Sequence, residues 1–144
     1  MRRKARLSRV PKMTRSFHDL TFVNAKVNLF PYKEEIGDDW SPAETEGDCD
    51  SYATAKQWRL VHTYDWPEKA TRLATCFVEE SVAPEKRNRY HCVLLVDFDG
   101  ATYVLDNRRP YPTAIDLVPY EWHKIWSYEL NAWEWAKDAD RSIA

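Results

Sequence analysis

Two short apolar runs on either side of an Asp-Gly pair place the strongest constraint on how this chain folds. Residues 91–97 and 102–106 are rich in valine and leucine, and Asp99-Gly100 lies at the centre of the four residues between them. Asp-Gly favours a two-residue turn that joins two antiparallel strands. The sequence therefore predicts a β-hairpin in which residues equally distant from the turn lie opposite each other.

The predicted register brings a histidine and an aspartate close together. Counting outward from the turn places Val93 opposite Asp106, and His91 lies two residues from Val93 on the same face of its strand. Diagonal neighbours across a strand pair lie about 7–8 Å apart at the backbone, within reach of planar side chains. A turn of another length would move the two residues to opposite faces, because strand side chains alternate. We therefore expect His91 to contact Asp106.

A cysteine opens the helix that the sequence predicts over residues 49–62. Most of these residues are good helix formers, and Asp48 stands where an N-cap belongs. Cys49 then lies in the first turn, where unpaired N–H groups and the helix dipole favour a thiolate. The neighbouring carboxylates of Asp48 and Asp50 oppose that charge, so a thiolate here requires a cationic partner such as an imidazolium.

Cys49, His91 and Asp106 each have an ordinary structural interpretation when taken singly. An isolated cysteine is usually a small core residue, an isolated histidine a satisfied polar group, and an aspartate at a strand end a turn former. Together they supply the nucleophile, the base and the orienting carboxylate that a catalytic triad requires. Spacing alone leaves the structural and the catalytic interpretation open.

The rest of the chain predicts one domain behind a basic arm. Residues 1–18 carry seven lysines and arginines and no acid, and residues 19–144 are expected to form a single core because 144 residues rarely bury two. Twenty aromatic residues against three glycines favour a packed globule. The further predicted elements are a helix over 19–30, an irregular loop over 32–48, strands over 73–79 and 120–128, and a final helix around 130–138.

The basic arm and the lack of long apolar runs indicate which partners and which cellular location to expect. A basic arm fits an acidic partner or nucleic acid, and it equally fits a solvated, frayed terminus. No run approaches the roughly 20 apolar residues of a membrane span, and no secretory signal follows the basic start. We expect a cytoplasmic or virion-associated protein.

The cysteines and acidic residues do not form a familiar metal pattern. Three cysteines without C-x-x-C spacing fit neither a disulfide framework nor a thiolate zinc site, so we expect reduced thiols, with Cys76 and Cys92 in structural positions. Asp48 and Asp50, with Glu44 or Glu46 nearby, offer hard oxygen ligands of the kind that calcium prefers. A solvated acidic loop is the favoured interpretation, and no cofactor is required.

Five blocks of the sequence, in order, resemble the bacterial transglutaminase-like cysteine proteinases. The blocks are V-N-x-x-V-N at 23–28, W-S-P-x-E-T at 40–45, G-D-C-D-x-Y-A at 47–53, H-C-V-L-L-V at 91–96 and Y-V-L-D-N at 103–107. The resemblance implies a papain-like α+β fold in which the cysteine helix packs on an antiparallel sheet. It also implies that Cys49, His91 and Asp106 are the catalytic residues.

The chain departs from the family pattern in two places. Ser51 stands where relatives usually carry a second acid after the cysteine, and the export signal of adhesin-cutting members is missing. The resemblance implies calcium binding in some relatives, which keeps Asp48 and Asp50 as candidate ligands. Compact size and the cationic arm suggest a phage or prophage protein.

The expected activity is endopeptidase cleavage of a protein or peptide substrate through a thioester. The oxyanion hole is expected to include the Cys49 backbone N–H, with a second donor that the sequence does not identify. Interception of the same thioester by an amine would give transglutaminase or deamidase chemistry on glutamine. The non-enzymatic alternative is a catalytically silent structural or binding module that retains the fold.

Overall fold

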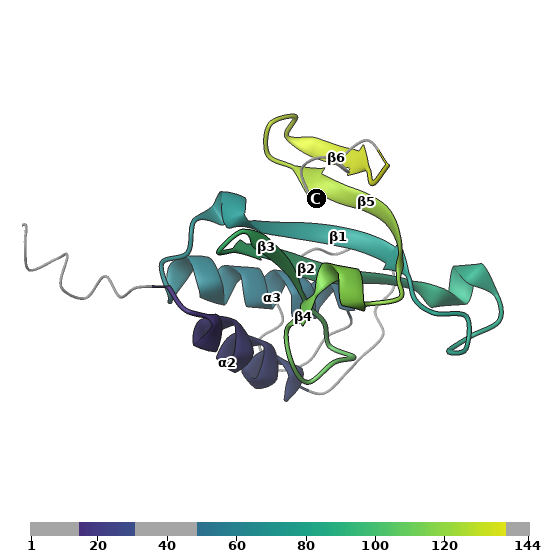
Figure 1. Ribbon diagram of the computed structural model, residues 1–144, viewed down its shortest axis with the longest axis horizontal. Coiled ribbons are helices and arrows are strands. Elements are labelled where there is room, and N and C mark those ends of the chain that lie inside the picture. Colours follow the sequence, from purple (N-terminus) through teal and green to yellow (C-terminus); the bar gives the residue numbers. More distant parts are fainter. Residues whose placement is uncertain (1–14, 31–48, 138–144) are drawn as a thin grey trace, which may run out of the picture.

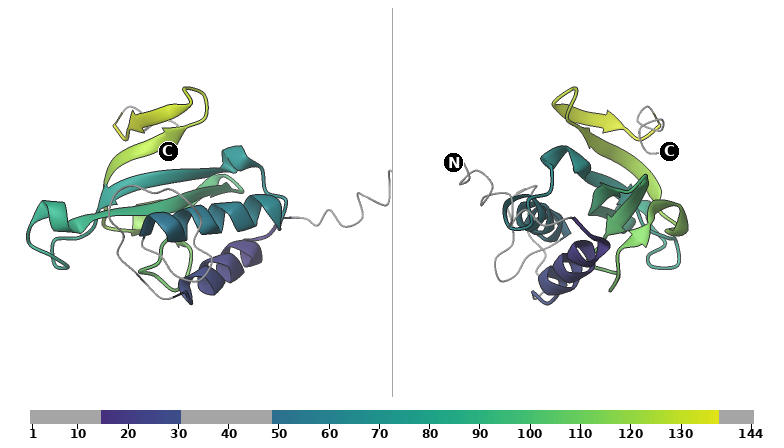
Figure 2. Two further views of the ribbon diagram at one scale, coloured as in Figure 1. Left: turned by 180° about the vertical axis from the view of Figure 1, so that it is seen from behind. Right: turned by 60° about the vertical axis from the view of Figure 1, so that its left-hand side comes forward.

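The structure, a computed structural model, describes residues 15–30 and 49–137. Two helices, α2 (Phe17–Asn28) and α3 (Cys49–His62), pack on one face of an antiparallel sheet (Figures 1 and 2). The strands are β1 (Thr71–Phe77), β2 (Tyr90–Phe98), β3 (Ala101–Leu105), β4 (Thr113–Ala114), β5 (Glu121–Ser127) and β6 (Ala132–Trp135). They form one six-stranded sheet in the order β4-β3-β2-β1-β5-β6. The predicted α+β architecture is confirmed.

Each helix follows from a local sequence pattern. In α2 the apolar residues Leu20, Val23 and Val27 recur at helical spacing and are buried. The helix begins two residues before the predicted start because the Ser16 N–H is held by the Asp19 carboxylate in a capping box. The bounds of α3 agree with the predicted helix, and the N-cap assigned to Asp48 lies outside the described residues.

The central strand β2 is buried on both faces. Alternate residues of β2 belong to two different hydrophobic clusters, as the two-residue period of a strand requires. Cys92, Leu94 and Val96 join the cluster beneath the helices. Val93 and Leu95 join a second cluster, to which Val118 and Tyr120 of the β4–β5 connection contribute. The central strand β2 is therefore a rigid base for the residues at its ends.

The hairpin between β2 and β3 has the predicted turn and register. Asp99 and Gly100 take φ values of 52° and 82°, so both central residues are left-handed. Phe98 pairs with Ala101, and the ladder continues to Leu94 opposite Leu105. The prediction that Val93 lies level with Asp106 is consistent with this register.

The turn gives a testable stability prediction. Gly100→Ala is expected to lower the free energy of unfolding by about 1 kcal/mol, because a Cβ is disfavoured at this positive φ. A Cβ at Gly100 would meet no atom within 4 Å, so the cost is conformational and not steric. Urea unfolding measures it, with Asp99→Asn as the matched control, because asparagine tolerates a left-handed backbone. A Gly100→Ala protein as stable as the wild type would contradict the turn described here.

The predicted C-terminal helix around 130–138 is wrong. Over its described part the chain turns at Asn131, whose φ is 53°, and returns as β6 alongside β5. Trp126 and Trp133 pair across the two strands with their ring centroids 5.6 Å apart. Large aromatic side chains stabilise strand pairs, and this cross-strand packing prevails over the local helical pattern.

The ends of the chain are only partly described. Arg15, the last basic residue of the arm, donates hydrogen bonds through its guanidinium to the carbonyl oxygen of Asp65. The rest of the arm before it and the predicted loop over 32–48 lie outside the described residues. Within the described ranges, none of the helices has the length and hydropathy needed to cross a bilayer.

Candidate active site

The predicted nucleophile lies at the N-terminus of α3. Cys49 is the first residue of the helix, it is partly buried, and it packs against the cluster beneath the helices. The N–H groups of a first helical turn have no partners within the helix, and the dipole is positive at this end. Both properties favour a thiolate at Cys49 over a neutral thiol.

The predicted base and its carboxylate are in contact. His91 lies near the start of β2, and Asp106 directly follows β3. The Nε2 atom of His91 lies 2.7 Å from Oδ1 of Asp106. The hairpin register therefore brings together the two residues that the sequence placed on one face.

Asp106 is held as an ionised carboxylate in a fully buried position. Its Oδ1 also accepts the Arg108 backbone N–H at 2.9 Å, and its Oδ2 accepts the Tyr120 hydroxyl. Burial alone would raise the pKa of Asp106, but the hydrogen bonds and the charge of His91 lower it to about 2. The aspartate therefore stays charged and fixes the orientation of the imidazole.

Cys49 and His91 stabilise each other's charged forms. The pKa of Cys49 falls to about 5 because its thiolate accepts hydrogen bonds from Cys92 and His91, although burial opposes the shift. Burial lowers the pKa of His91, but its hydrogen bonds to Asp106 and Cys49 raise it to about 9. Because Nε2 of His91 contacts Asp106, Nδ1 is the ring nitrogen left for the hydrogen bond to the Cys49 sulfur. The favoured state near neutral pH is a thiolate–imidazolium pair.

Cys92, which the sequence predicts in a structural position, lies beside Cys49 of the Cys49–His91 pair. Its sulfur lies 2.8 Å from Oδ1 of Asp50, and the Cys49 sulfur lies 3.6 Å from the same oxygen. The single S–H of Cys92 therefore has two alternative acceptors, the Asp50 carboxylate and the Cys49 thiolate. One atom from each of Cys49, Asp50 and Cys92 lies within 4.8 Å of the other two. Burial raises the pKa of Cys92, so this thiol stays protonated and acts as a hydrogen-bond donor. Cys76 is also buried, with a raised pKa.

Comparison with known protein families shows the class of this chain. The family model described as bacterial transglutaminase-like cysteine proteinase BTLCP matches residues 2–142. The chain belongs to this family. It is therefore a cysteine peptidase, as the five sequence blocks indicated. No curated protein is similar enough to the sequence to count as a match.

Solved structures of LapG from Legionella pneumophila share the fold of this cysteine peptidase. Calcium-bound LapG is 20% identical with a TM-score of 0.68, and the match covers 83% of this chain and 68% of LapG. A second LapG structure is 19% identical with a TM-score of 0.67, covering 91% of this chain and 76% of LapG. EGTA-treated LapG is 19% identical with a TM-score of 0.62, covering 77% and 63%. The likeness confirms the transglutaminase-like fold.

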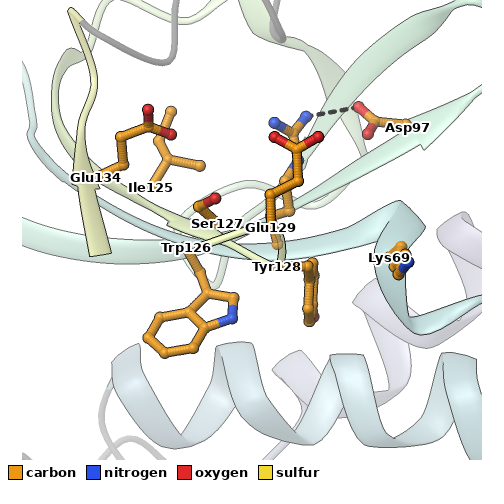
Figure 3. Close-up of a pocket in the computed structure, with 9 residues that line it drawn as sticks. Lys69, Asp97, Ile125, Trp126, Ser127, Tyr128, Glu129 and Glu134 are labelled. Carbon is orange, nitrogen blue, oxygen red and sulfur yellow. Dashed lines mark hydrogen bonds and ion pairs between the residues drawn. The ribbon is translucent and has the colours of Figure 1, made fainter. Parts of the chain in front are cut away.

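A pocket of about 230 Å³ (Figure 3) is lined by residues at the other end of the sheet from Cys49, His91 and Asp106. Its lining includes Asp97, Trp126 and Glu129, which belong to the last part of β2 and to the end of β5 and the turn after it. The register of β1 with β2 places His91 opposite Cys76, near the opposite end of both strands. The pocket therefore does not present a substrate to Cys49.

Several residues that shape the site of the cysteine peptidase were not predicted from sequence. Tyr120 was assigned to a strand start, yet its hydroxyl binds Asp106 across 14 residues of sequence. Asn24 and Asn28 belong to the first family-like block, at residues 23–28, and both hydrogen-bond to the segment that carries Asp106. The signal available was their spacing of four on an otherwise apolar helix face. The fully buried Lys56 of α3, which hydrogen-bonds to Asn24, could not be predicted from sequence, because a lysine in a helix is normally exposed.

Proposed function

We propose that the protein is an endopeptidase that cleaves a protein substrate with Cys49 as nucleophile, His91 as general acid and base, and Asp106 as the orienting carboxylate. The observation that carries the proposal is the 2.7 Å contact between His91 and Asp106, beside a cysteine whose pKa is lowered to about 5. Buried groups with strongly shifted pKa values and mutual contacts are typical of catalytic sites.

The geometry supports acyl transfer in two steps. The Cys49 thiolate attacks the carbonyl carbon of the scissile peptide bond, and His91 gives its Nδ1 proton to the departing amine. The acyl group is then held as a thioester on Cys49. His91 takes a proton from water, which attacks the thioester and releases the carboxylic acid. Asp106 remains ionised in both steps, because its pKa of about 2 lies far below neutral pH.

The start of α3 also supplies one hydrogen-bond donor for the developing negative charge. In each tetrahedral intermediate the former carbonyl oxygen carries that charge near the sulfur. The Cys49 backbone N–H is the first of the helix and has no acceptor within it. We assign it as one donor of the oxyanion hole, worth about 10²–10³ in rate if it behaves like other such donors.

The direct test is cleavage of a general protein substrate. Fluorescein-labelled casein is incubated with the protein, and new peptide termini are identified by mass spectrometry. We expect fragments in the presence of wild type, blocked by prior alkylation of Cys49. Release of ammonia from glutamine peptides without chain cleavage would instead indicate deamidase chemistry. A protein that neither cleaves nor deamidates, and whose Cys49 alkylates slowly, would be a silent scaffold.

The pH dependence of cleavage follows from the two pKa shifts. Below about pH 5 Cys49 binds a proton and the thiolate is lost. Above about pH 9 His91 loses its proton and no longer protonates the leaving amine. We expect a bell-shaped profile of kcat/KM with limbs near these values. A single rising limb near pH 9, the behaviour of an ordinary thiol, would contradict a thiolate–imidazolium pair of Cys49 and His91.

Calcium is proposed as a structural ion next to Asp50, on the strength of the likeness to calcium-bound LapG. Asp50 offers hard oxygen donors, whereas the nearby sulfurs of Cys49 and Cys92 do not suit calcium. Asp48, Glu44 and Glu46 would have to supply the remaining carboxylates, and they lie outside the described residues. No step of the reaction above depends on the ion.

Thermal unfolding with calcium and with EGTA tests this assignment without an activity assay. Calcium is expected to raise Tm by several degrees, because an ion that binds the folded state stabilises it. Asp50→Asn is expected to remove most of that increase, whereas Asp116→Asn, at an exposed position outside the site, should retain it. Equal Tm values in calcium and EGTA would exclude a structural calcium.

A further inference from the structure

Lys56 is a fully buried lysine beneath the candidate active site. It lies on α3, about two turns after Cys49, and has 0% of its surface exposed. Its Nζ donates to Oδ1 of Asn24 on α2 at 2.8 Å. Burying an ammonium group costs free energy that an apolar side chain of similar length would not cost. Packing therefore does not explain why a lysine occupies this position.

The contact with Lys56 fixes the orientation of the Asn24 amide. An asparagine side chain has one oxygen acceptor and one NH₂ donor. Because the oxygen accepts from Lys56, the NH₂ group points the other way and donates to the carbonyl oxygen of Arg109 at 3.0 Å. A flipped amide would set its NH₂ group against the ammonium of Lys56. The lysine thus allows only one orientation of Asn24.

A second asparagine of α2 holds the other end of the same segment. Asn28, one turn after Asn24, donates to the carbonyl oxygens of Asp106 at 3.0 Å and Arg109 at 3.2 Å. The strand β3 ends at Leu105, so these carbonyls lie beyond the described ladder of the sheet. The two amides therefore replace strand pairing as the anchor of residues 106–109.

Segment 106–109 carries the carboxylate that orients His91. Within the segment, the Arg109 N–H donates to the Asp106 carbonyl at 3.2 Å and the Arg108 N–H to the Asp106 carboxylate at 2.9 Å. The Tyr120 hydroxyl and the Glu79 carboxylate hold its side chains from other parts of the sheet. These bonds set the shape of the turn but not its position relative to the helices. The segment's backbone is tied to the helices by α2, whose Asn24 is in turn held by α3, the helix that begins with Cys49.

We propose that Lys56 is a positioning residue for the reaction: through Asn24 it locks segment 106–109 and keeps Asp106 on His91. This inference rests on the proposed function, because it assigns Lys56 a role in that same triad. The charges of Lys56 and Asp106 are consistent with this role. Burial lowers the pKa of Lys56 to about 7, and attraction to Asp106 opposes that shift, so the lysine and the aspartate stabilise each other.

Lys56→Met tests the proposal, because methionine fills a similar volume without charge or donor. The protein is expected to fold, because methionine fills the buried space, with a modest loss of Tm because the Asn24 oxygen loses its donor. The rate of Cys49 alkylation by iodoacetamide at pH 7 is expected to fall about tenfold, as for the loss of one member of a coupled network. The downfield ¹H NMR resonance of the proton between His91 and Asp106 is expected to shift or broaden. A purely structural lysine would not move that resonance.

Asn24→Asp separates the two contacts of Asn24. Aspartate still accepts from Lys56, but it has no NH₂ group to donate to the Arg109 carbonyl. The same fall in the Cys49 alkylation rate and the same change in the His91–Asp106 resonance are therefore expected. If Lys56→Met fails to fold, Asn24→Asp still tests whether this contact chain positions Asp106. The matched control is Gln57→Met on the same helix, because the Gln57 amide binds Thr71 and Tyr128, away from segment 106–109. It should leave the alkylation rate and the resonance unchanged.

Wild-type alkylation rates and an unshifted resonance in both Lys56→Met and Asn24→Asp would overturn the proposal and leave the proposed function intact. Slow alkylation of wild-type Cys49 would instead contradict the proposed function. In that case the His91–Asp106 resonance in the two variants still decides whether Lys56 positions Asp106.

Discussion

Cys49→Ala is expected to reduce peptide-bond hydrolysis by about 10⁴-fold or more, because the variant has no group to form the thioester. The residual rate should come only from binding and from the oxyanion donor. The measurement compares initial rates of casein cleavage by wild type and variant, with fragments identified by mass spectrometry. Folding should be intact, since alanine is a good helix former at this position.

Cys76→Ala is the matched control for the cysteine change. Cys76 is fully buried in β1, in the cluster on the face away from the helices. Its replacement removes a core sulfur and is expected to lower the free energy of unfolding by about 1 kcal/mol, with cleavage retained. Equal activity of Cys49→Ala and wild type would show that another group performs the chemistry.

Asp106→Asn is expected to reduce kcat by about 10⁴-fold, the effect of neutralising the aspartate of a Ser-His-Asp triad. The amide has nearly the same shape as the carboxylate but gives no charge to stabilise the imidazolium. The pKa of His91 should then fall from about 9 toward its ordinary value, because its largest favourable interaction is lost. The descending limb of the pH profile should therefore move to lower pH.

The exposed Asp116 provides the control for this neutralisation. Asp116→Asn makes the same chemical change on the short helix between β4 and β5, away from His91, and should leave kcat and both limbs unchanged. If Asp106→Asn kept the wild-type descending limb, Asp106 would not be the residue that sets the protonation of His91.

Local rules predicted the parts of the site that depend on short stretches of sequence. The helix that begins at Cys49 follows from a run of helix formers, and the contact between His91 and Asp106 follows from one turn and the alternation of strands. The Asp-Gly turn fixes the register of every pair in the hairpin, so a single local feature determines the position of a long-range contact.

The features that the sequence did not predict depend on contacts between segments that are distant in the chain. Trp126 and Trp133 form a strand pair where the local pattern favoured a helix. Tyr120 binds Asp106 only because the β4–β5 connection crosses the face of the sheet, and Lys56 is buried only because α2 packs against α3. Such arrangements depend on tertiary packing, which overrides local propensity.

The pairing of Cys49 with His91 is tested most directly by the iodoacetamide alkylation rate of each cysteine between pH 5 and 9, in wild type and His91→Ala. Mass spectrometry assigns the adducts. We predict fast labelling confined to Cys49, because Cys76 and Cys92 are buried with raised pKa values. We also predict an apparent pKa near 5 that rises by several units in His91→Ala, with labelling at pH 7 slowed about 10- to 100-fold. Slow labelling of Cys49 that is indifferent to His91 would contradict an activated thiolate–imidazolium pair and indicate a silent scaffold.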